Sequence, residues 1–370
     1  MGRIQRIFLT HLHGDHLFGL PGLMCTLSAA RAAAASTAST ASTSSSPQPT
    51  PAGVVDLNTA PGSQGGGESS LLELVGPPGL REYIRTSLRL SYSFLSYPYT
   101  VHELHTPESA AASGGGVGSL GADIPFGSEI LGKNLVPADP KKSPLSWVIP
   151  SELPGPLVVA GSIQHSVPTV GYVLQEPNTA GKLNVDAIRP LLEKNKEGLQ
   201  KQGVKNPMAL LAKVKGGEKV SLPDGTELDP ANFVGPERPG KKVAILGDTH
   251  DPWSMRDLLL DCDLLVHEAT NARLAADSDK TEDEVEETAK DHGHSTPQMA
   301  GKFGREVGAR CLVLTHFSQR YKGDEEPESV ATMEEIRLLA EREFNRDRVA
   351  RGEKGLEVII ARDLATIPVK

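Results

Sequence analysis

Aromatic residues, cysteines and long apolar runs are all scarce in this 370-residue sequence. Aromatic residues make up 4% of the chain and hydrophobic residues 38%, which is less than in an average globular protein. No stretch comes near 18 consecutive apolar residues, so the sequence predicts no transmembrane helix and no membrane partner. The N-terminus lacks the apolar segment of a signal peptide. These absences argue against insertion into a membrane.

The three cysteines, Cys25, Cys262 and Cys311, are odd in number and lie far apart in the sequence. They provide neither a disulfide framework nor a CxxC metal motif, and they fit a reducing compartment. We therefore expect an intracellular protein. The cytoplasm or the nucleus is favoured, and an organelle stays open.

The formal net charge of −9 argues against a protein that coats nucleic acid uniformly. Segment 182–242 differs from the rest, because it holds 12 Lys and Arg against 8 Asp and Glu, a balance of +4 that leaves −13 elsewhere. Composition alone leaves two interpretations open. The segment is either an irregular, solvated excursion or an arm that binds a polyanion.

Glycine and proline are plentiful, at 37 and 28 residues. Residues 29–70 consist almost entirely of Ala, Ser, Thr, Gly, Pro and Gln, so they bury too little apolar area to offset the entropy lost on ordering. We predict a disordered insert at 29–70, a flexible Gly-rich loop at 108–122 and a Pro-rich loop near 137–156.

Between these segments, short strand-like runs alternate with helical ones. Several strand-like runs end in polar side chains, as Ile4–Thr10 does at His11 and Val243–Leu246 does before Asp248. Strands of this kind, separated by helices, favour a layered α/β domain with its functional site along one sheet edge. We predict a single domain over residues 1–370, with helices at 80–90, 253–260, 297–307 and 333–344.

The segment at residues 10–16 carries the strongest chemical signal. His11 and His13 are two residues apart, so in an extended backbone they point the same way and can bind one metal ion. The glycine that follows permits a tight turn, which brings Asp15 and His16 toward a second ion. Imidazole and carboxylate groups suit zinc. The pattern H-x-H-x-D-H therefore predicts a site for two metal ions.

Two tetrahedral sites need more ligands than one loop supplies. The remaining candidates are single residues at other predicted strand ends, namely His165, Asp248 and His316. Each of them alone would more often be a structural group than a ligand. Together they complete the coordination at one sheet edge, where the Asp248 carboxylate could bridge the ions.

The histidine motif followed by these single residues resembles the metallo-β-lactamase superfamily, and further segments resemble short-form ribonuclease Z, the tRNA 3′-processing endonuclease. The resemblance implies an αββα sandwich and a homodimer. It also implies a zinc-dependent endoribonuclease that removes the 3′ trailer from precursor tRNA and leaves a 3′-hydroxyl on the tRNA. The segments are Gly79–Tyr83, His165–Tyr172, Gly247–Thr249, His267–Thr270, Gly293–Thr296 and Thr315–Tyr321.

The same resemblance implies two zinc ions that share one bridging carboxylate. One ion would be bound by His11, His13 and His165, the other by Asp15, His16 and His316, and Asp248 would bridge the pair.

Three residues would act on the substrate in this family. Asp15 would orient the attacking water or accept its proton, in addition to its metal contact. His294 would protonate the departing 3′ oxygen of the RNA, and Glu268 would hold His294 in its orientation. His292 is chemically as capable, and His294 is preferred because Ser-Thr follows it as in the family.

Family members carry a basic excursion at the position of segment 182–242, which clamps the tRNA body. They also carry several dozen residues ahead of the histidine loop, whereas His11 follows Met1 almost at once. We therefore expect the first strands of one sheet to be missing. The chain either continues upstream or is a non-catalytic form.

Two other functions stay open. One is a hydrolase of the same fold that acts on small phosphodiesters or thioesters. The other is a truncated chain that binds RNA or a partner without turnover.

Overall fold

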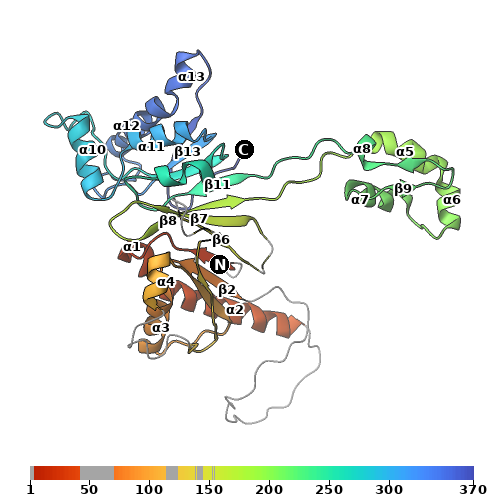
Figure 1. Ribbon diagram of the computed structural model, residues 1–370, viewed down its shortest axis with the longest axis horizontal. Coiled ribbons are helices and arrows are strands. Elements are labelled where there is room, and N and C mark those ends of the chain that lie inside the picture. The colour runs from red at the N-terminus through yellow and green to blue at the C-terminus, as the bar shows by residue number, and fades with distance from the viewer. Residues whose placement is uncertain are drawn as a thin grey trace, which may run out of the picture. The chain divides into compact units, whose positions relative to one another are not determined.

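The computed structural model describes residues 4–41, 71–113, 124–137, 139, 145–151, 153 and 155–370. It separates into two compact units (Figure 1). The large unit is formed by Met1–Pro154, Val158–Val173 and Val243–Lys370, and the small unit by Gly155–Leu157 and Leu174–Lys242.

The first sheet of the large unit has parallel strand pairs. Its order is β1-β2-β3-β4, and β5 also pairs with β3. Strands β2 and β3 are buried along their whole length, as is typical of strands covered on both faces. The strands are β1 (Arg6–Phe8), β2 (Leu72–Gly76), β3 (Tyr99–Leu104), β4 (Glu129–Ile130) and β5 (Asn134–Leu135).

The second sheet has the order β14-β13-β12-β11-β8-β7-β6. The four strands from β11 to β14 run parallel, whereas β6 and β7 are antiparallel. The strands are β6 (Ser146–Ile149), β7 (Leu157–Ile163), β8 (Thr169–Gln175), β11 (Lys242–Ile245), β12 (Leu264–Glu268), β13 (Cys311–Thr315) and β14 (Glu357–Ile360).

The two sheets meet where β8 contacts the N-terminal segment. The buried hydroxyl of Tyr172 donates a 2.6 Å hydrogen bond to the Leu9 carbonyl, and the Tyr172 ring lies 5.2 Å from the Phe8 ring. The Val170 amide donates to the Thr10 carbonyl at 2.9 Å. These contacts fix the chain just before the histidine loop.

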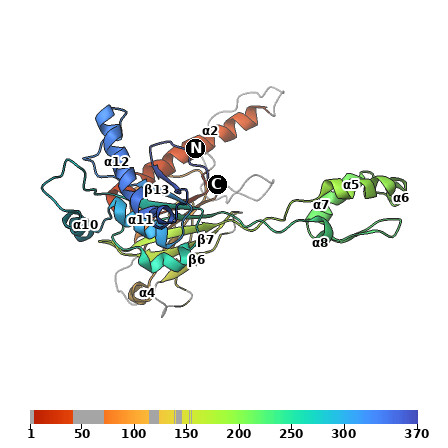
Figure 2. The same cartoon turned by 90° about the horizontal axis from the view of Figure 1, so that it is seen from above.

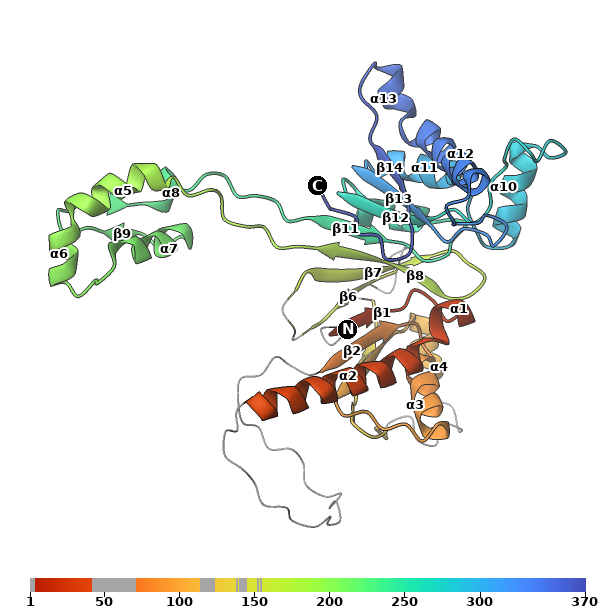
Figure 3. The same cartoon turned by 180° about the vertical axis from the view of Figure 1, so that it is seen from behind.

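Helices cover the outer face of each sheet (Figures 1 and 3). The side chains of Met24 and Ile84 are fully buried in the core of the first sheet, and those of Phe303 and Ile336 in the core of the second. The resulting helix–sheet–sheet–helix order is the predicted αββα sandwich. The main helices are α2 (Leu20–Ala41) and α3 (Leu80–Leu90) on the first sheet, and α11 (Pro297–Glu306) and α12 (Pro327–Phe344) on the second.

Helix α2 corrects the prediction of disorder at 29–70. Residues 29–41 belong to this helix, which runs as one piece (Figure 2). Leu20, Met24 and Leu27 pack in the core and hold the first turns of the helix in place. Extending a helix that has already formed is much easier than starting one, and alanine is the best helix former, so the helix continues through residues 29–41. Residues 42–70 lie outside the described residues.

The same region revises the prediction that no segment is apolar enough to span a membrane. By length and composition alone, Gly14–Ala34 could cross a membrane. Core helices of soluble proteins share this property. Several apolar side chains of this segment pack in the core of the first sheet instead. That the protein has no membrane partner stays a prediction.

Helix α4 (Pro107–Ser113) and strand β6 correct the two shorter loop predictions. Residues 108–113 are helical, because proline favours the first helical position and alanines follow it. Residues 114–122 lie outside the described residues. Within 137–156, strand β6 buries Trp147 and Ile149 and exposes Val148, the two-residue alternation of a strand on a core.

The small unit has an apolar core of its own, so the interpretation of 182–242 as an irregular, solvated excursion is wrong. Its main segment, Leu174–Lys242, also begins earlier than residue 182. Its elements are α5 (Val185–Lys194), α6 (Lys196–Lys201), η1 (Pro207–Ala209), α7 (Leu210–Lys215), β9 (Val220–Ser221), β10 (Glu227–Leu228) and α8 (Pro230–Phe233). Its buried core residues are Leu183, Ile188, Leu192, Leu199, Leu210, Val214, Leu222 and Leu228.

The close approach of α11 to α12 gives a test of the second core. A methyl group added at Gly301 would collide with the backbone carbonyl oxygen of Ala340. We expect Gly301→Ala to lower the free energy of unfolding by about 1–3 kcal/mol, measured by urea denaturation. Gly323→Ala is the matched control, because a methyl group there meets nothing within 4 Å. Equal stability of the two variants would contradict this packing.

Candidate metal centre

The histidine loop follows β1 and leads into a one-turn helix, α1 (Gly14–Leu17). His13 has an extended backbone with ψ of 155°, whereas Asp15 and His16 lie within the helical turn. The change of backbone conformation at this point lets neighbouring residues present their side chains in two directions. His11, the first ligand candidate, is fully buried.

The structure brings all seven predicted ligands into two groups that share Asp248. Within each group, one donor atom of every residue lies within 4.8 Å of the donor atoms of the others. The first group is His11, His13, His165 and Asp248, and the second is Asp15, His16, Asp248 and His316.

Three of these residues come from the carboxyl ends of strands in the second sheet. His165 follows β7, Asp248 follows β11 and His316 follows β13. His316 has a φ of 57°, a left-handed conformation that costs a non-glycine residue about 1–2 kcal/mol. Such strain concentrates at functional sites, where surrounding contacts hold it.

The buried carboxylate of Asp248 dominates the electrostatics of the centre. Three imidazole Nε2 atoms surround its Oδ2, at 3.2 Å for His316, 3.5 Å for His16 and 3.6 Å for His11. Burial by itself would raise the pKa of Asp248, but these imidazoles lower it to about 2. Burial lowers the pKa of His11 to about 4. Both groups are therefore unprotonated at neutral pH, the state that binds a metal ion.

The unpaired donor atoms at this centre fit a bound cation. The Nε2 atoms of His11 and His16 are buried and have no hydrogen-bond partner in the part of the chain that the structure describes. The Asp248 carboxylate, whose Oδ2 lies 3.5 Å from His16 Nε2, raises the pKa of His16, so the centre favours positive charge. Imidazole nitrogens and carboxylate oxygens are the donor set of a zinc-type site.

The predicted catalytic pair, His294 and Glu268, lies beside the second ligand group. His294 stacks on His316 with ring centroids 5.4 Å apart, and its Nδ1 donates a 3.0 Å hydrogen bond to Glu268 Oε1. This bond raises the pKa of His294, against the opposing effect of burial. His292, the alternative candidate, is exposed and bonds the Thr288 carbonyl.

Thr270 links Glu268 of the predicted catalytic pair to the predicted ligand His316, a contact that the sequence did not reveal. Its Oγ1 lies 2.8 Å from His316 Nδ1 and 2.6 Å from Glu268 Oε2. His316 can therefore donate to the threonine hydroxyl, which donates in turn to Glu268. The only sequence signal was the position of Thr270 two residues after Glu268 in the segment His267–Thr270.

Comparison with known proteins places the chain in a family, although no family model matches it. The mouse protein named zinc phosphodiesterase ELAC protein 1 is 32% identical over 374 residues, covering 100% of this chain and 85% of that protein. Ribonuclease Z from Streptococcus sanguinis is 30% identical over 320 residues, covering 86% and 73%. The chain belongs to the ribonuclease Z family.

Among solved structures, that of human tRNase Z, short form, is 25% identical, with a TM-score of 0.47 over 100% of this chain and 80% of that one. The layered α/β architecture of the chain, with its two sheets between helices, is the αββα sandwich that the sequence predicts.

Asp248 gives the sharpest test of the metal centre, because it belongs to both ligand groups. We expect Asp248→Ala to reduce the bound divalent metal by more than about tenfold, measured by inductively coupled plasma mass spectrometry on the dialysed protein. Asp257→Ala removes a carboxylate that is 88% exposed and lies outside both groups, so its metal content should match the parent. Unchanged metal in the Asp248 variant would refute the shared site.

Proposed function

We propose that this chain is a zinc-dependent endoribonuclease that cuts the 3′ trailer from precursor tRNA and leaves a 3′-hydroxyl on the tRNA. One observation carries the proposal: two ligand groups share Asp248 directly beside the His294–Glu268 pair. Membership of the ribonuclease Z family supports the choice of substrate.

Two zinc ions would be held by the two ligand groups, with Asp248 bridging. When bound, zinc ions lower the pKa of a coordinated water to near neutrality and stabilise negative charge on phosphate oxygens. Asp15 is the most exposed of the proposed ligands, with 66% of its side chain accessible. Its carboxylate is accessible to solvent, and it would orient a water molecule or accept the proton of that water.

His294 would supply the proton for the leaving group. The water oxygen forms a bond to phosphorus, the bond between phosphorus and the 3′ oxygen breaks, and the 3′ oxygen takes a proton from His294. Glu268 supports this step because its hydrogen bond to Nδ1 favours the protonated imidazole. With Nδ1 occupied, Nε2 is the atom that can donate to the substrate.

The small unit would bind the body of the tRNA. A cavity of about 470 Å³ in this unit is lined by Lys182, Lys215 and Arg238, and no acidic residue lines it. Clustered cations of this kind favour phosphate binding. We also expect a homodimer and an intracellular location in a reducing compartment, most consistent with cytoplasm or nucleus, and no membrane partner.

The role of His294 is testable by a single substitution. We expect His294→Ala to lower kcat for a precursor tRNA transcript by at least about 100-fold, with the metal content unchanged. His292→Ala removes the exposed neighbouring imidazole and should cleave like the parent. Loss of metal from the His294 variant would contradict the assignment, because the residue would then be a ligand.

Two other experimental results would each indicate a different function. A chain that cleaves a small phosphodiester with a higher kcat/KM than precursor tRNA would be a hydrolase for small substrates. A chain that holds two zinc ions yet leaves precursor tRNA uncut at every concentration would be a non-catalytic binding protein.

The cations of the small unit give a prediction for binding. We expect the double substitution Lys215→Ala and Arg238→Ala to weaken binding of precursor tRNA. The slope of log Kd against log salt should fall by roughly two, because about one counterion is released per phosphate contact. Cleavage of a small phosphodiester is the control and should not change. An unchanged salt slope would place the tRNA contacts elsewhere.

A further inference from the structure

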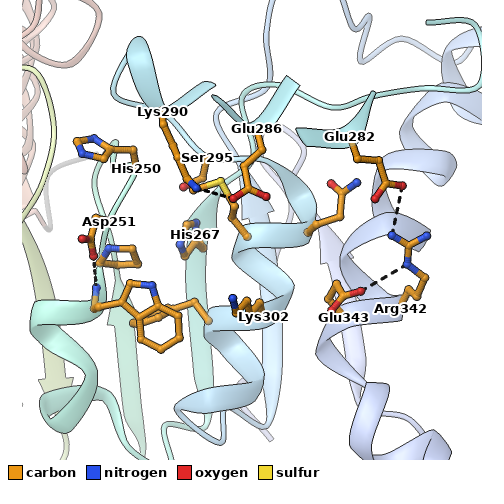
Figure 4. Close-up of a pocket in the computed structure, with 15 residues that line it drawn as sticks. His250, Asp251, His267, Glu282, Glu286, Lys290, Ser295, Lys302, Arg342 and Glu343 are labelled. Carbon is orange, nitrogen blue, oxygen red and sulfur yellow. Dashed lines mark hydrogen bonds and ion pairs between the residues drawn. The ribbon is translucent and has the colours of Figure 1, made fainter. Parts of the chain in front are cut away.

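A second cavity of the large unit lies apart from the metal centre, and we call it the His267 pocket (Figure 4). Its volume is about 450 Å³, within the range of small-molecule sites. Helix α11 forms one wall, with Gln298 and Lys302, and Trp253 and His250 come from the segment after β11. None of the seven proposed ligands lines it.

The pocket is lined by buried polar atoms that lack partners. The His267 side chain is fully buried, and its Nδ1 lies 2.7 Å from the Glu268 carbonyl oxygen. A carbonyl oxygen only accepts, so Nδ1 carries the hydrogen, and Nε2 of the neutral ring is an acceptor. That Nε2 atom and Gln298 Oε1 are both buried without a hydrogen-bond partner among the described residues. Leaving such acceptors unpaired is costly.

The charged side chains around the pocket make ion pairs or hydrogen bonds, except for Lys302. Lys290 pairs with Glu286 at 2.5 Å, and Arg342 pairs with Glu282 at 3.5 Å, as the dashed lines in Figure 4 show. Lys302 is exposed and makes no ion pair or hydrogen bond within the described part of the chain. One ammonium group is therefore available to a bound anion.

These groups match an adenine nucleotide. A glutamine amide binds adenine in two places, with its oxygen accepting from the N6 amino group and its nitrogen donating to N7. The second N6 hydrogen is then available to His267 Nε2. Trp253, 42% exposed, offers an indole ring for stacking. Lys302, one helical turn after Gln298, is on the same face of α11 and can reach the phosphate.

We propose that the His267 pocket binds an adenine nucleotide through His267, Gln298, Trp253 and Lys302. The nucleotide is either free or part of an RNA strand, since both offer the same chemistry. The pocket touches the catalytic pair through the backbone: His267 precedes Glu268 on β12, and Ser295, which follows His294, also lines the cavity. A bound nucleotide would therefore restrain both catalytic residues.

Tryptophan fluorescence of the full chain tests the proposal, because one of its two tryptophans lies in the pocket. AMP should quench the emission saturably, and Trp253→Phe should abolish the quenching. Lys302→Ala should weaken AMP binding about tenfold and leave adenosine binding unchanged, whereas Gln298→Ala should weaken both about tenfold. Lys354→Ala is a control, because Lys354 lies outside the pocket.

Comparison ligands give the results that would overturn the proposal. Ribose 5-phosphate binding as tightly as AMP would leave the base unrecognised. Spermidine binding in place of AMP would make the pocket an amine site. AMP binding unchanged by both Lys302→Ala and Gln298→Ala would place the nucleotide elsewhere. A five-nucleotide oligoadenylate that quenches Trp253 more tightly than AMP would support the RNA-borne form of the ligand.

Discussion

The metal centre depends on one buried negative charge. The Asp248 side chain is only 5% exposed, and an uncompensated carboxylate at such a position costs several kcal/mol. Three imidazoles surround it, those of His11 and His16 from the histidine loop and that of His316 from the end of β13. The stability of the carboxylate therefore requires these groups to stay in place. The contacts of Asp248 with these imidazoles therefore hold the histidine loop, which follows β1 of the first sheet, against the strand ends of the second sheet.

The site was more predictable from sequence than the surrounding structure. Ligand chemistry restricts residue type and spacing, so H-x-H-x-D-H is informative even before the fold is known. The carboxyl ends of neighbouring parallel strands meet at one edge of a sheet, which is why Asp248 and His316 come together although they are 68 positions apart in the sequence. Helix α3 has the bounds that its periodicity predicted, Leu80–Leu90.

Other features were out of reach of the sequence because they depend on tertiary contacts. Residues 29–41 have a composition that is common in disordered segments, and only the buried start of α2 makes the helix persist. Thr270 gains its position from the approach of β13 to β12. Thr296 caps α11, whereas the amide of the neighbouring Ser295 donates to Glu268.

Among the residues that the structure describes, the core of the small unit shares no side chain with the cores on the two sheets of the large unit. Mutations that alter its surface or loosen its packing therefore leave the metal ligands untouched. Over evolutionary time, such a unit is free to drift in length and charge while the hydrolytic centre stays under its own separate selection. Relatives would then diverge fastest within Leu174–Lys242.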